Sequence, residues 1–159
     1  MIDVFIAAEA GESADPYSSC MDYVRTSDLV VAGLEERLKG REAVGLRVDA
    51  VFSYGAVDID PKNLVVWVLL SGRPDTELPE WYFPASIDIP NFLKATPLVG
   101  GDARKNRHLD DGVVPACRSW AEEIRAAFAP TGWPASESIS VGFDSSHRVK
   151  EGGGWNYFK

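Results

Sequence analysis

The stretch Asp58-Ile59-Asp60-Pro61-Lys62-Asn63-Leu64-Val65-Val66-Trp67-Val68-Leu69-Leu70-Ser71-Gly72-Arg73-Pro74 decides the fold. Seven apolar residues follow one another from 64 to 70, between residues that favour turns. A run this short, rich in β-branched residues and bounded by Pro and Gly, is typical of a strand rather than a helix. Its lack of alternation predicts burial on both faces, so we place this strand inside a sheet.

The residues before this strand predict a second strand beside it. Apolar Leu46, Val48, Ala50, Phe52 and Tyr54 recur at every second position. A period of two indicates a strand with one buried face. Because the connection from 55 to 62 is short, we expect the two strands to form an antiparallel pair.

One helix is predicted before this pair of strands in the sequence, and one after it. Apolar residues recur at helical spacing from 16 to 39, and Gly40 ends the pattern. Thr26-Ser27-Asp28 could be an internal N-cap that splits this region in two. The clearest helix begins at 110–112 and carries one apolar stripe, formed by Val113, Cys117, Trp120, Ala121, Ile124 and Phe128.

The remaining elements complete a prediction of fold class. Residues 139–143 alternate as a strand, 155–158 are expected to form a terminal strand, and 2–8 are a strand or the start of a helix. The order predicts one α+β domain over 1–159, a two-layer sandwich with two main helices on one face of an antiparallel sheet. It is compatible with a ferredoxin-like βαββαβ order with an extra C-terminal strand. The alternative is an unrelated α+β sandwich in which 2–8 are helical. A long irregular loop is expected at about 71–109.

Composition and charge restrict the classes of function. The 159 residues include 16 basic and 24 acidic side chains, a net charge of −8. This balance argues against a nucleic-acid partner, whose phosphates require a basic surface. No apolar run reaches the ~20 residues that span a bilayer, and the first residues lack the basic start of a signal peptide. We therefore expect a cytoplasmic protein, a monomer or weak homodimer, with Cys20 and Cys117 reduced.

The best catalytic candidate is His108 with Asp110 and Asp111. A histidine beside carboxylates can supply a general base with its orienting partner. The spacing matches no zinc signature, and Asp at a helix start is explained by capping. We therefore predict no metal and no cofactor, and keep these three residues as the catalytic alternative.

A partner-binding surface is the stronger prediction. Trp81-Tyr82-Phe83 are three successive aromatic residues in an acidic, Pro-rich segment, and Trp and Tyr are over-represented at binding hot spots. The alternative is that these aromatics anchor the loop to the sheet. The predicted partner-binding residues are Asp58, Asp60, Asp75, Glu77, Glu80, Trp81 and Tyr82.

These observations favour a non-catalytic, acidic protein-binding module. By analogy of type, it would be a bacterial inhibitor or immunity-type protein that neutralises a basic protein partner. One alternative is a small hydrolase-like enzyme that uses His108 in a pocket under the 71–109 loop. Another is a ferredoxin-like module that binds a small molecule.

Overall fold

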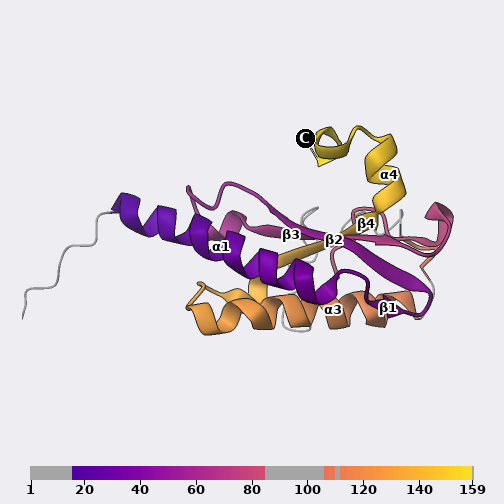
Figure 1. The fold of residues 1–159 in the computed structure, drawn as a ribbon, viewed down its shortest axis with the longest axis horizontal. Helices are drawn as coiled ribbons and strands as arrows, with labels where there is room; N and C mark the ends of the chain where they lie inside the picture. Colours follow the sequence, from indigo (N-terminus) through magenta and orange to yellow (C-terminus); the bar gives the residue numbers. More distant parts are fainter. Residues whose placement is uncertain (1–15, 85–105, 110–111, 159) are drawn as a thin grey trace, which may run out of the picture.

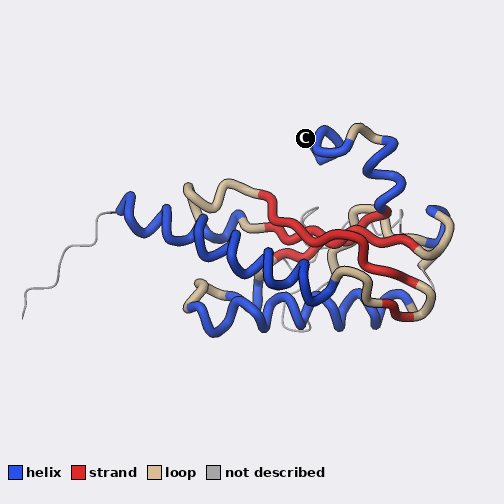
Figure 2. Tube along the Cα trace, viewed as in Figure 1, coloured by secondary structure: helices blue, strands red, loops and turns tan. Residues whose placement is uncertain are grey.

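The computed structural model describes residues 16–84, 106–109 and 112–158 (Figure 1). Figure 2 shows the same view coloured by helix, strand and loop. The helices and strands in order are α1 Pro16–Leu38, β1 Glu42–Ala43, β2 Leu46–Tyr54, β3 Val65–Ser71, α3 Val113–Phe128, β4 Ser140–Ser145 and α4 Ser146–Glu151. Short 3₁₀ turns are η1 Pro61–Asn63, η2 Asp75–Glu77, η4 Ala129–Thr131, η5 Ser136–Ser138 and η6 Gly154–Phe158.

The described strands form one mixed sheet in the order β1-β2-β3-β4. β2 and β3 pair antiparallel, as the short connection predicted, and Phe52 lies opposite Trp67. β4 instead runs parallel to β3, where an all-antiparallel sheet was expected. The reason is α3, which carries the chain from the end of β3 back to the start of β4. β4 pairs with β3 directly, whereas a ferredoxin-like sheet would have another strand between these two.

β3 is buried on both faces, which confirms the interpretation of its apolar run. Its even-numbered residues, such as Val66 and Val68, join the large core under α1 and α3. Its odd-numbered residue Trp67 is 2% exposed and lies in a second cluster on the opposite face, with Phe83 and Phe158. The sheet therefore separates two apolar clusters (Figure 1).

An irregularity in β2 interrupts the predicted alternation. The register with β3 shifts between Val48 and Ala50. Val51 consequently joins Val48 in the core under the helices, whereas Phe52 turns to the opposite face and packs against Phe158. The prediction that Phe52 shares a face with Val48 was wrong, because one extra residue in a strand inverts the faces of all that follow.

The two predicted helices are both present. α1 is continuous through Thr26-Ser27-Asp28, so the alternative of two helices is not adopted. α3 buries the predicted stripe, including the free thiol of Cys117, whose pKa is raised by burial. The residue before α3 is Gly112, and no side chain caps the helix there. The predicted caps Asp110 and Asp111 lie outside the described residues, as do 2–8.

The C-terminal region differs from the prediction. Residues 155–158, expected to form a strand, lie in η6. The segment after β4, expected to be a turn, forms α4, whose N-cap Ser145 accepts a hydrogen bond from the N–H of Arg148. α4 and η6 lie on the face of the sheet opposite α1 and α3 (Figure 1). The α+β class is confirmed. Among the described helices, none is long and apolar enough to cross a membrane.

Candidate functional site

The predicted partner-binding residues lie at opposite ends of β3. Asp58 and Asp60 are in the connection from β2 to the start of β3. The residues from Asp75 to Tyr82 follow the end of β3. Seven residues of extended strand separate the two groups, so they do not form one continuous surface. Each end of the sheet is therefore considered separately.

At the first end, the carboxylates of Asp58 and Asp60 have different surroundings. The side chain of Asp60 caps η1 and accepts a hydrogen bond from the N–H of Lys62 at 2.8 Å. Asp side chains commonly accept such hydrogen bonds in turns. Asp58 is exposed, and neighbouring Ile59 is 78% exposed. Of the two carboxylates, Asp58 is the one placed to contact a partner.

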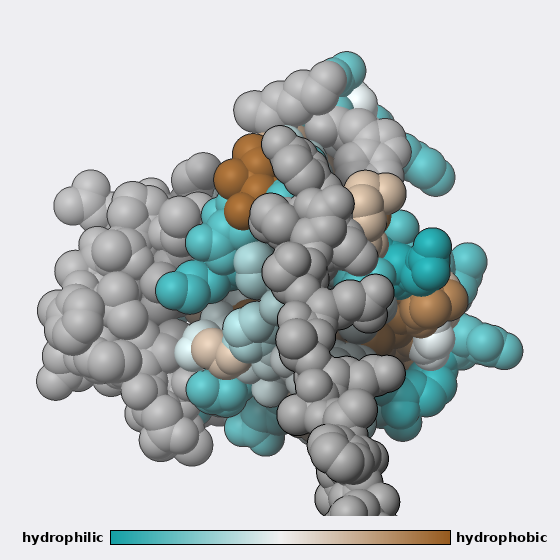
Figure 3. Space-filling model, turned by 90° about the vertical axis from the view of Figure 1, so that its left-hand side faces the viewer, coloured by the Kyte–Doolittle hydropathy of each residue, from teal (hydrophilic) through white to brown (hydrophobic). Residues whose placement is uncertain are grey.

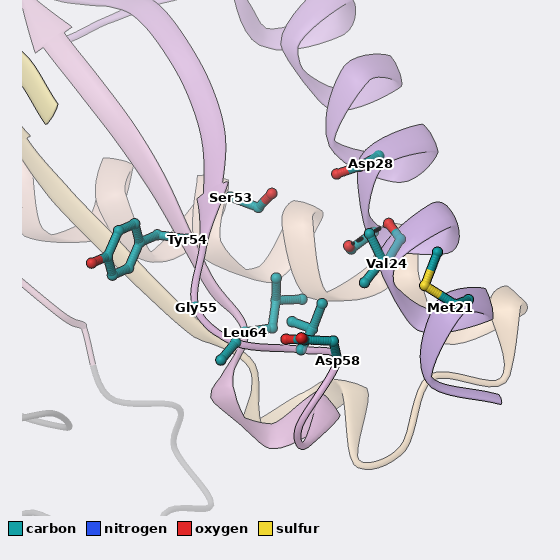
Figure 4. Close-up of a pocket in the computed structure, with 11 residues that line it drawn as sticks. Met21, Val24, Asp28, Ser53, Tyr54, Gly55, Asp58 and Leu64 are labelled. Carbon is teal, nitrogen blue, oxygen red and sulfur yellow. Dashed lines mark hydrogen bonds between the residues drawn. The ribbon is translucent and has the colours of Figure 1, made fainter. Parts of the chain in front are cut away.

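Asp58 lies on one wall of a cleft of about 830 Å³ between the N-terminal half of α1 and the β2–β3 connection (Figure 4). In Figure 4, Asp28 and Val24 extend from α1 toward the strand, and Ser53 extends from β2 toward α1. Leu64 lies at the start of β3, on the side of the connection. The lining residues are Met21, Val24, Ser27, Asp28, Ser53, Tyr54, Gly55, Ala56, Val57, Asp58 and Leu64.

Among the described residues that line this cleft, the only charged side chains are acidic. Asp28 and Asp58 stand on its two walls, and both are exposed. No Lys, Arg or His is among the residues that line it. Within the described part of the chain neither carboxylate has an ion-pair partner. Two uncompensated carboxylates facing one groove attract a cation or a basic side chain.

An exposed apolar side chain accompanies these carboxylates. Met21 is 66% exposed on α1, whereas Tyr54, 41% exposed at the end of β2, directs its ring away from α1 (Figure 4). Figure 3 shows the end of the molecule from which α1 projects, where small hydrophobic patches (brown) lie among hydrophilic residues (teal). Protein-binding sites usually have an apolar core, from which charged residues are depleted, and a polar, solvent-accessible rim.

At the other end of β3, the acidic and aromatic segment is held against the sheet. The ring of Trp81 packs edge-on against Trp67, with centroids 5.2 Å apart. The main chain of Tyr82 exchanges two hydrogen bonds with Phe143, at 3.0 and 2.8 Å. Phe83 is buried in the same cluster. These contacts favour the alternative in which the aromatics anchor the segment.

A buried ion pair holds this segment to the C-terminal region. Asp144 is fully buried, and its Oδ1 accepts a hydrogen bond from Nη1 of Arg148 at 2.8 Å. Its Oδ2 accepts hydrogen bonds from the N–H of Trp81 at 3.1 Å and the hydroxyl of Tyr157 at 3.0 Å. Burial raises the pKa of Asp144, and the hydrogen bonds, that of Arg148 foremost, act against this rise.

Arg148 extends this connection to the segment after β3. Its Nη1 donates to the carbonyl of Pro79 and its Nη2 to the carbonyl of Asp75, both at 2.8 Å. The Asp75 carboxylate accepts hydrogen bonds from Ser145 Oγ and, at 2.6 Å, from His147 Nδ1. The Ser145 hydrogen bond lowers the pKa of Asp75 more than burial raises it, and Asp75 in turn raises the pKa of His147.

A third carboxylate joins β2 to α4. Asp49 accepts hydrogen bonds from Ser146 Oγ at 2.6 Å, Ser71 Oγ at 2.8 Å and Arg47 Nε at 3.1 Å. Burial raises the pKa of Asp49, but these three hydrogen bonds together lower it by more, so the pKa lies below its usual value. This role could not be predicted from the sequence, because Ser71 and Ser146 lie on β3 and α4, far from Asp49 along the chain.

Chemically, this polar end of the sheet is committed to structure. Asp75, Asp144 and Asp49 are each occupied by donors from the chain itself. His147 is oriented by Asp75 as a general base would be, but its Nε2 lies 3.7 Å from a carboxylate oxygen of Glu151. No buried side-chain polar atom of the described residues lacks a hydrogen-bond partner. The described residues also contain no group of three or more His, Cys, Asp or Glu placed to hold a metal ion.

The remaining predicted residues lie between these elements. Glu77 is exposed, and the main chain of Glu80 exchanges hydrogen bonds with the Asn106 amide at 2.9 and 2.8 Å. His108 is exposed, and its Nε2 lies 2.9 Å from the carbonyl of Leu78. That contact fixes the 106–109 segment beside the 75–82 segment. Because Asp110 and Asp111 lie outside the described residues, the catalytic alternative stays a prediction.

No known family model, curated protein or solved structure matches this chain. We therefore infer function from the cleft and from the hydrogen bonds of Asp49, Asp75 and Asp144.

Proposed function

We propose that this chain is a non-catalytic, acidic protein-binding module whose basic partner docks in the cleft between α1 and the β2–β3 connection. The observation that carries the proposal is the acidic lining of that cleft, in which Asp28 and Asp58 lie on the two walls and none of the described lining residues is basic. A lysine or arginine of a partner would form charge-assisted hydrogen bonds with these carboxylates.

The overall charge supports the same class of partner. A net charge of −8 on 159 residues repels other acidic proteins and attracts basic ones over the screened range of about 8 Å at physiological ionic strength. Electrostatic complementarity of this kind mainly raises the association rate and excludes wrong partners. Affinity then requires an apolar anchor, for which Met21 is exposed beside the cleft.

The finer form of the proposal is an inhibitor or immunity-type protein that neutralises its basic partner. A small acidic domain in which Asp49, Asp75 and Asp144 accept hydrogen bonds from the chain itself suits a role that needs a stable binding surface rather than chemistry. This finer form is an analogy of type with small acidic neutralising proteins.

The test compares two charge-reversal variants that differ only in where the charges lie. Asp28→Lys with Asp58→Lys changes the cleft, and Glu36→Lys with Glu137→Lys makes the same change in net charge at exposed positions outside it. Both variants and the unmodified protein are immobilised and exposed to lysate of the source cell. Any basic protein retained is then purified, and its dissociation constant for all three proteins is measured.

The proposal expects the cleft variant to bind at least about tenfold more weakly than the control variant, about 1.4 kcal/mol. Equal binding by both variants would show that the partner recognises net charge rather than the cleft. Equal binding by all three proteins would place the interaction elsewhere, and the 75–82 segment would be the next surface to test.

A further inference from the structure

Among the described residues, no strand lies beside the outer edge of β2 for most of its length. β1 has two residues and pairs with Leu46 and Arg47 alone. The main chain of Gly40 and Arg41 continues the pairing as far as Val48. From there to Tyr54, no described strand lies beside β2 on this side. An edge of this kind can pair with a strand of another chain.

The register shows which main-chain groups face outward on this edge. Val48 directs its N–H to Arg41 and its C=O to Gly40, away from β3. The partner of Val48 on β3 is Leu70, whose N–H and C=O therefore point away from β2. Main-chain directions alternate along a strand, so the N–H and C=O of Val68 and Val66 also point away from β2. Their partners on β2 are Val51 and Ser53, so the N–H and C=O of these two residues also point outward.

The acidic cleft lies beside the same edge. Ser53 and Tyr54 belong to both, and Figure 4 shows Ser53 directed toward α1 across the cleft. A strand paired with β2 would turn every second side chain toward the cleft. Those side chains would meet Asp28 on one wall and Asp58 on the other, which favours lysine or arginine at alternate positions.

We infer that the partner contributes an extended segment, basic at alternate positions, that adds a strand to the outer edge of β2. This inference rests on the proposed function and names its mode of binding. In strand addition, main-chain hydrogen bonds supply affinity and alternate side chains supply specificity. The charge of the cleft argues against a second copy of this chain as the occupant, because two such edges would bring the Asp28 and Asp58 carboxylates of both copies together.

The probe is a terminally capped peptide of about ten residues that alternates Lys with Thr, long enough to span the open edge. One control peptide carries N-methyl groups on alternate amides, which removes the main-chain donors along one side. A second replaces Lys with Glu. Binding is measured by fluorescence anisotropy of the labelled peptide, and by hydrogen exchange of the Val51 and Ser53 amides with and without it.

The protein variants separate the main chain from the side chain at one position. Ser53→Pro removes the outward N–H, a change that an edge strand tolerates, and Ser53→Ala keeps it. Circular dichroism and thermal melting show whether Ser53→Pro retains the fold. If it does not, the N-methylated peptide tests the same hydrogen bonds from the other side.

The inference expects slower exchange at Val51 and Ser53, and about tenfold weaker binding for Ser53→Pro and for the N-methylated peptide. Ser53→Ala should bind within about twofold of the unmodified protein, and the Glu peptide should not bind. If reversal of Asp28 and Asp58 weakens binding but N-methylation and Ser53→Pro do not, strand addition is wrong and cleft binding stands. No binding of the Lys-Thr peptide at ~1 mM also overturns the inference. So does a self-association, seen by sedimentation, that Ser53→Pro abolishes.

Discussion

Replacing Arg148 with Ala tests the account of the polar end of the sheet. The substitution removes the hydrogen bonds from the guanidinium to Asp144, to the Pro79 carbonyl and to the Asp75 carbonyl, each 2.8 Å long. It also leaves the fully buried Asp144 carboxylate without its cation. The Arg148 side chain is 22% exposed, so solvent screens this ion pair only partly.

The expected loss of unfolding free energy is about 3 kcal/mol. Removing one partner of a buried ion pair typically costs about 3–5 kcal/mol, because the other charge stays buried and uncompensated. The lower end applies here, since Asp144 keeps the hydrogen bonds from Trp81, Ser145 and Tyr157. Urea unfolding at neutral pH measures the difference.

The loss should also depend on pH, with a sign set by Asp144. Burial already raises the folded-state pKa of Asp144 above 3.8, and removing the nearby cation raises it further. A group with a raised pKa in the folded state destabilises it above that pKa, and the penalty shrinks as the pH falls toward 3.8. The difference between Arg148→Ala and the unmodified protein should therefore decrease as the medium is acidified.

Arg118→Ala, at an exposed position on α3, is the matched control and should change stability by less than about 0.5 kcal/mol. A loss below about 1 kcal/mol for Arg148→Ala, or a loss that does not change with pH, would refute the reasoning. Either result would mean that Asp144 does not depend on this cation.

Three further predictions concern the core, the aromatic anchor and the loss of stability at acidic pH. Trp120→Ala should reduce the free energy of unfolding by about 3–5 kcal/mol, because the indole is 5% exposed in the large core. Denaturant titration measures this loss, and a value below about 1 kcal/mol would contradict that packing. Trp81→Ala should lower the melting temperature while partner affinity is unchanged, since its ring packs on Trp67, and the reverse pattern would restore this residue as a binding contact. Asp49 and Asp75 have lowered pKa values in the folded state, so their contribution is present above 3.8 and is lost as the pH falls through those lower values. Asp49→Asn should therefore flatten the decline of melting temperature with acidification, and an unchanged decline would exclude it as a contributor.

The elements that could be predicted from the sequence are those whose burial pattern is set by residues close together in the chain. The run from 64 to 70 is a strand buried on both faces, and the stripe of α3 is buried as expected. These patterns depend on the chain within a few residues. The faces of β2 depend instead on the irregularity at 48–50, and nothing in the local alternation marks it.

The parallel pairing of β4 was missed for a different reason. A strand, a long connection with a helix, and another strand form the unit that usually gives parallel neighbours. The order of β3, α3 and β4 carried that signal. The expectation of a ferredoxin-like order outweighed it. Residues 155–158 were expected to form a strand because aromatic residues favour strands, but they lie in η6, where Phe158 packs against Trp67.

The candidate site was only partly predictable. Asp58 was among the predicted partner-binding residues, and it lines the cleft. Asp28 and Met21 were interpreted as parts of a helix pattern, and no local signal distinguished them from core or cap residues. Their role arises because the N-terminal half of α1 faces the β2–β3 connection across the cleft (Figure 4). Such a feature depends on how two distant segments lie side by side, which sequence periodicity does not encode.

The two ends of the sheet differ in how their carboxylates are used, and this difference favours the cleft as the binding site. At the carboxyl end of β3, Asp75 and Asp144 accept hydrogen bonds from the chain's own donors, so a partner would have to displace them. At the cleft, Asp28 and Asp58 are exposed and have no ion-pair partner among the described residues. A basic partner can bind there without breaking an existing interaction. The hydrogen bonds of Asp75 and Asp144 hold the C-terminal region to the sheet, whereas Asp28 and Asp58 lie beside an edge of β2 that no described strand covers.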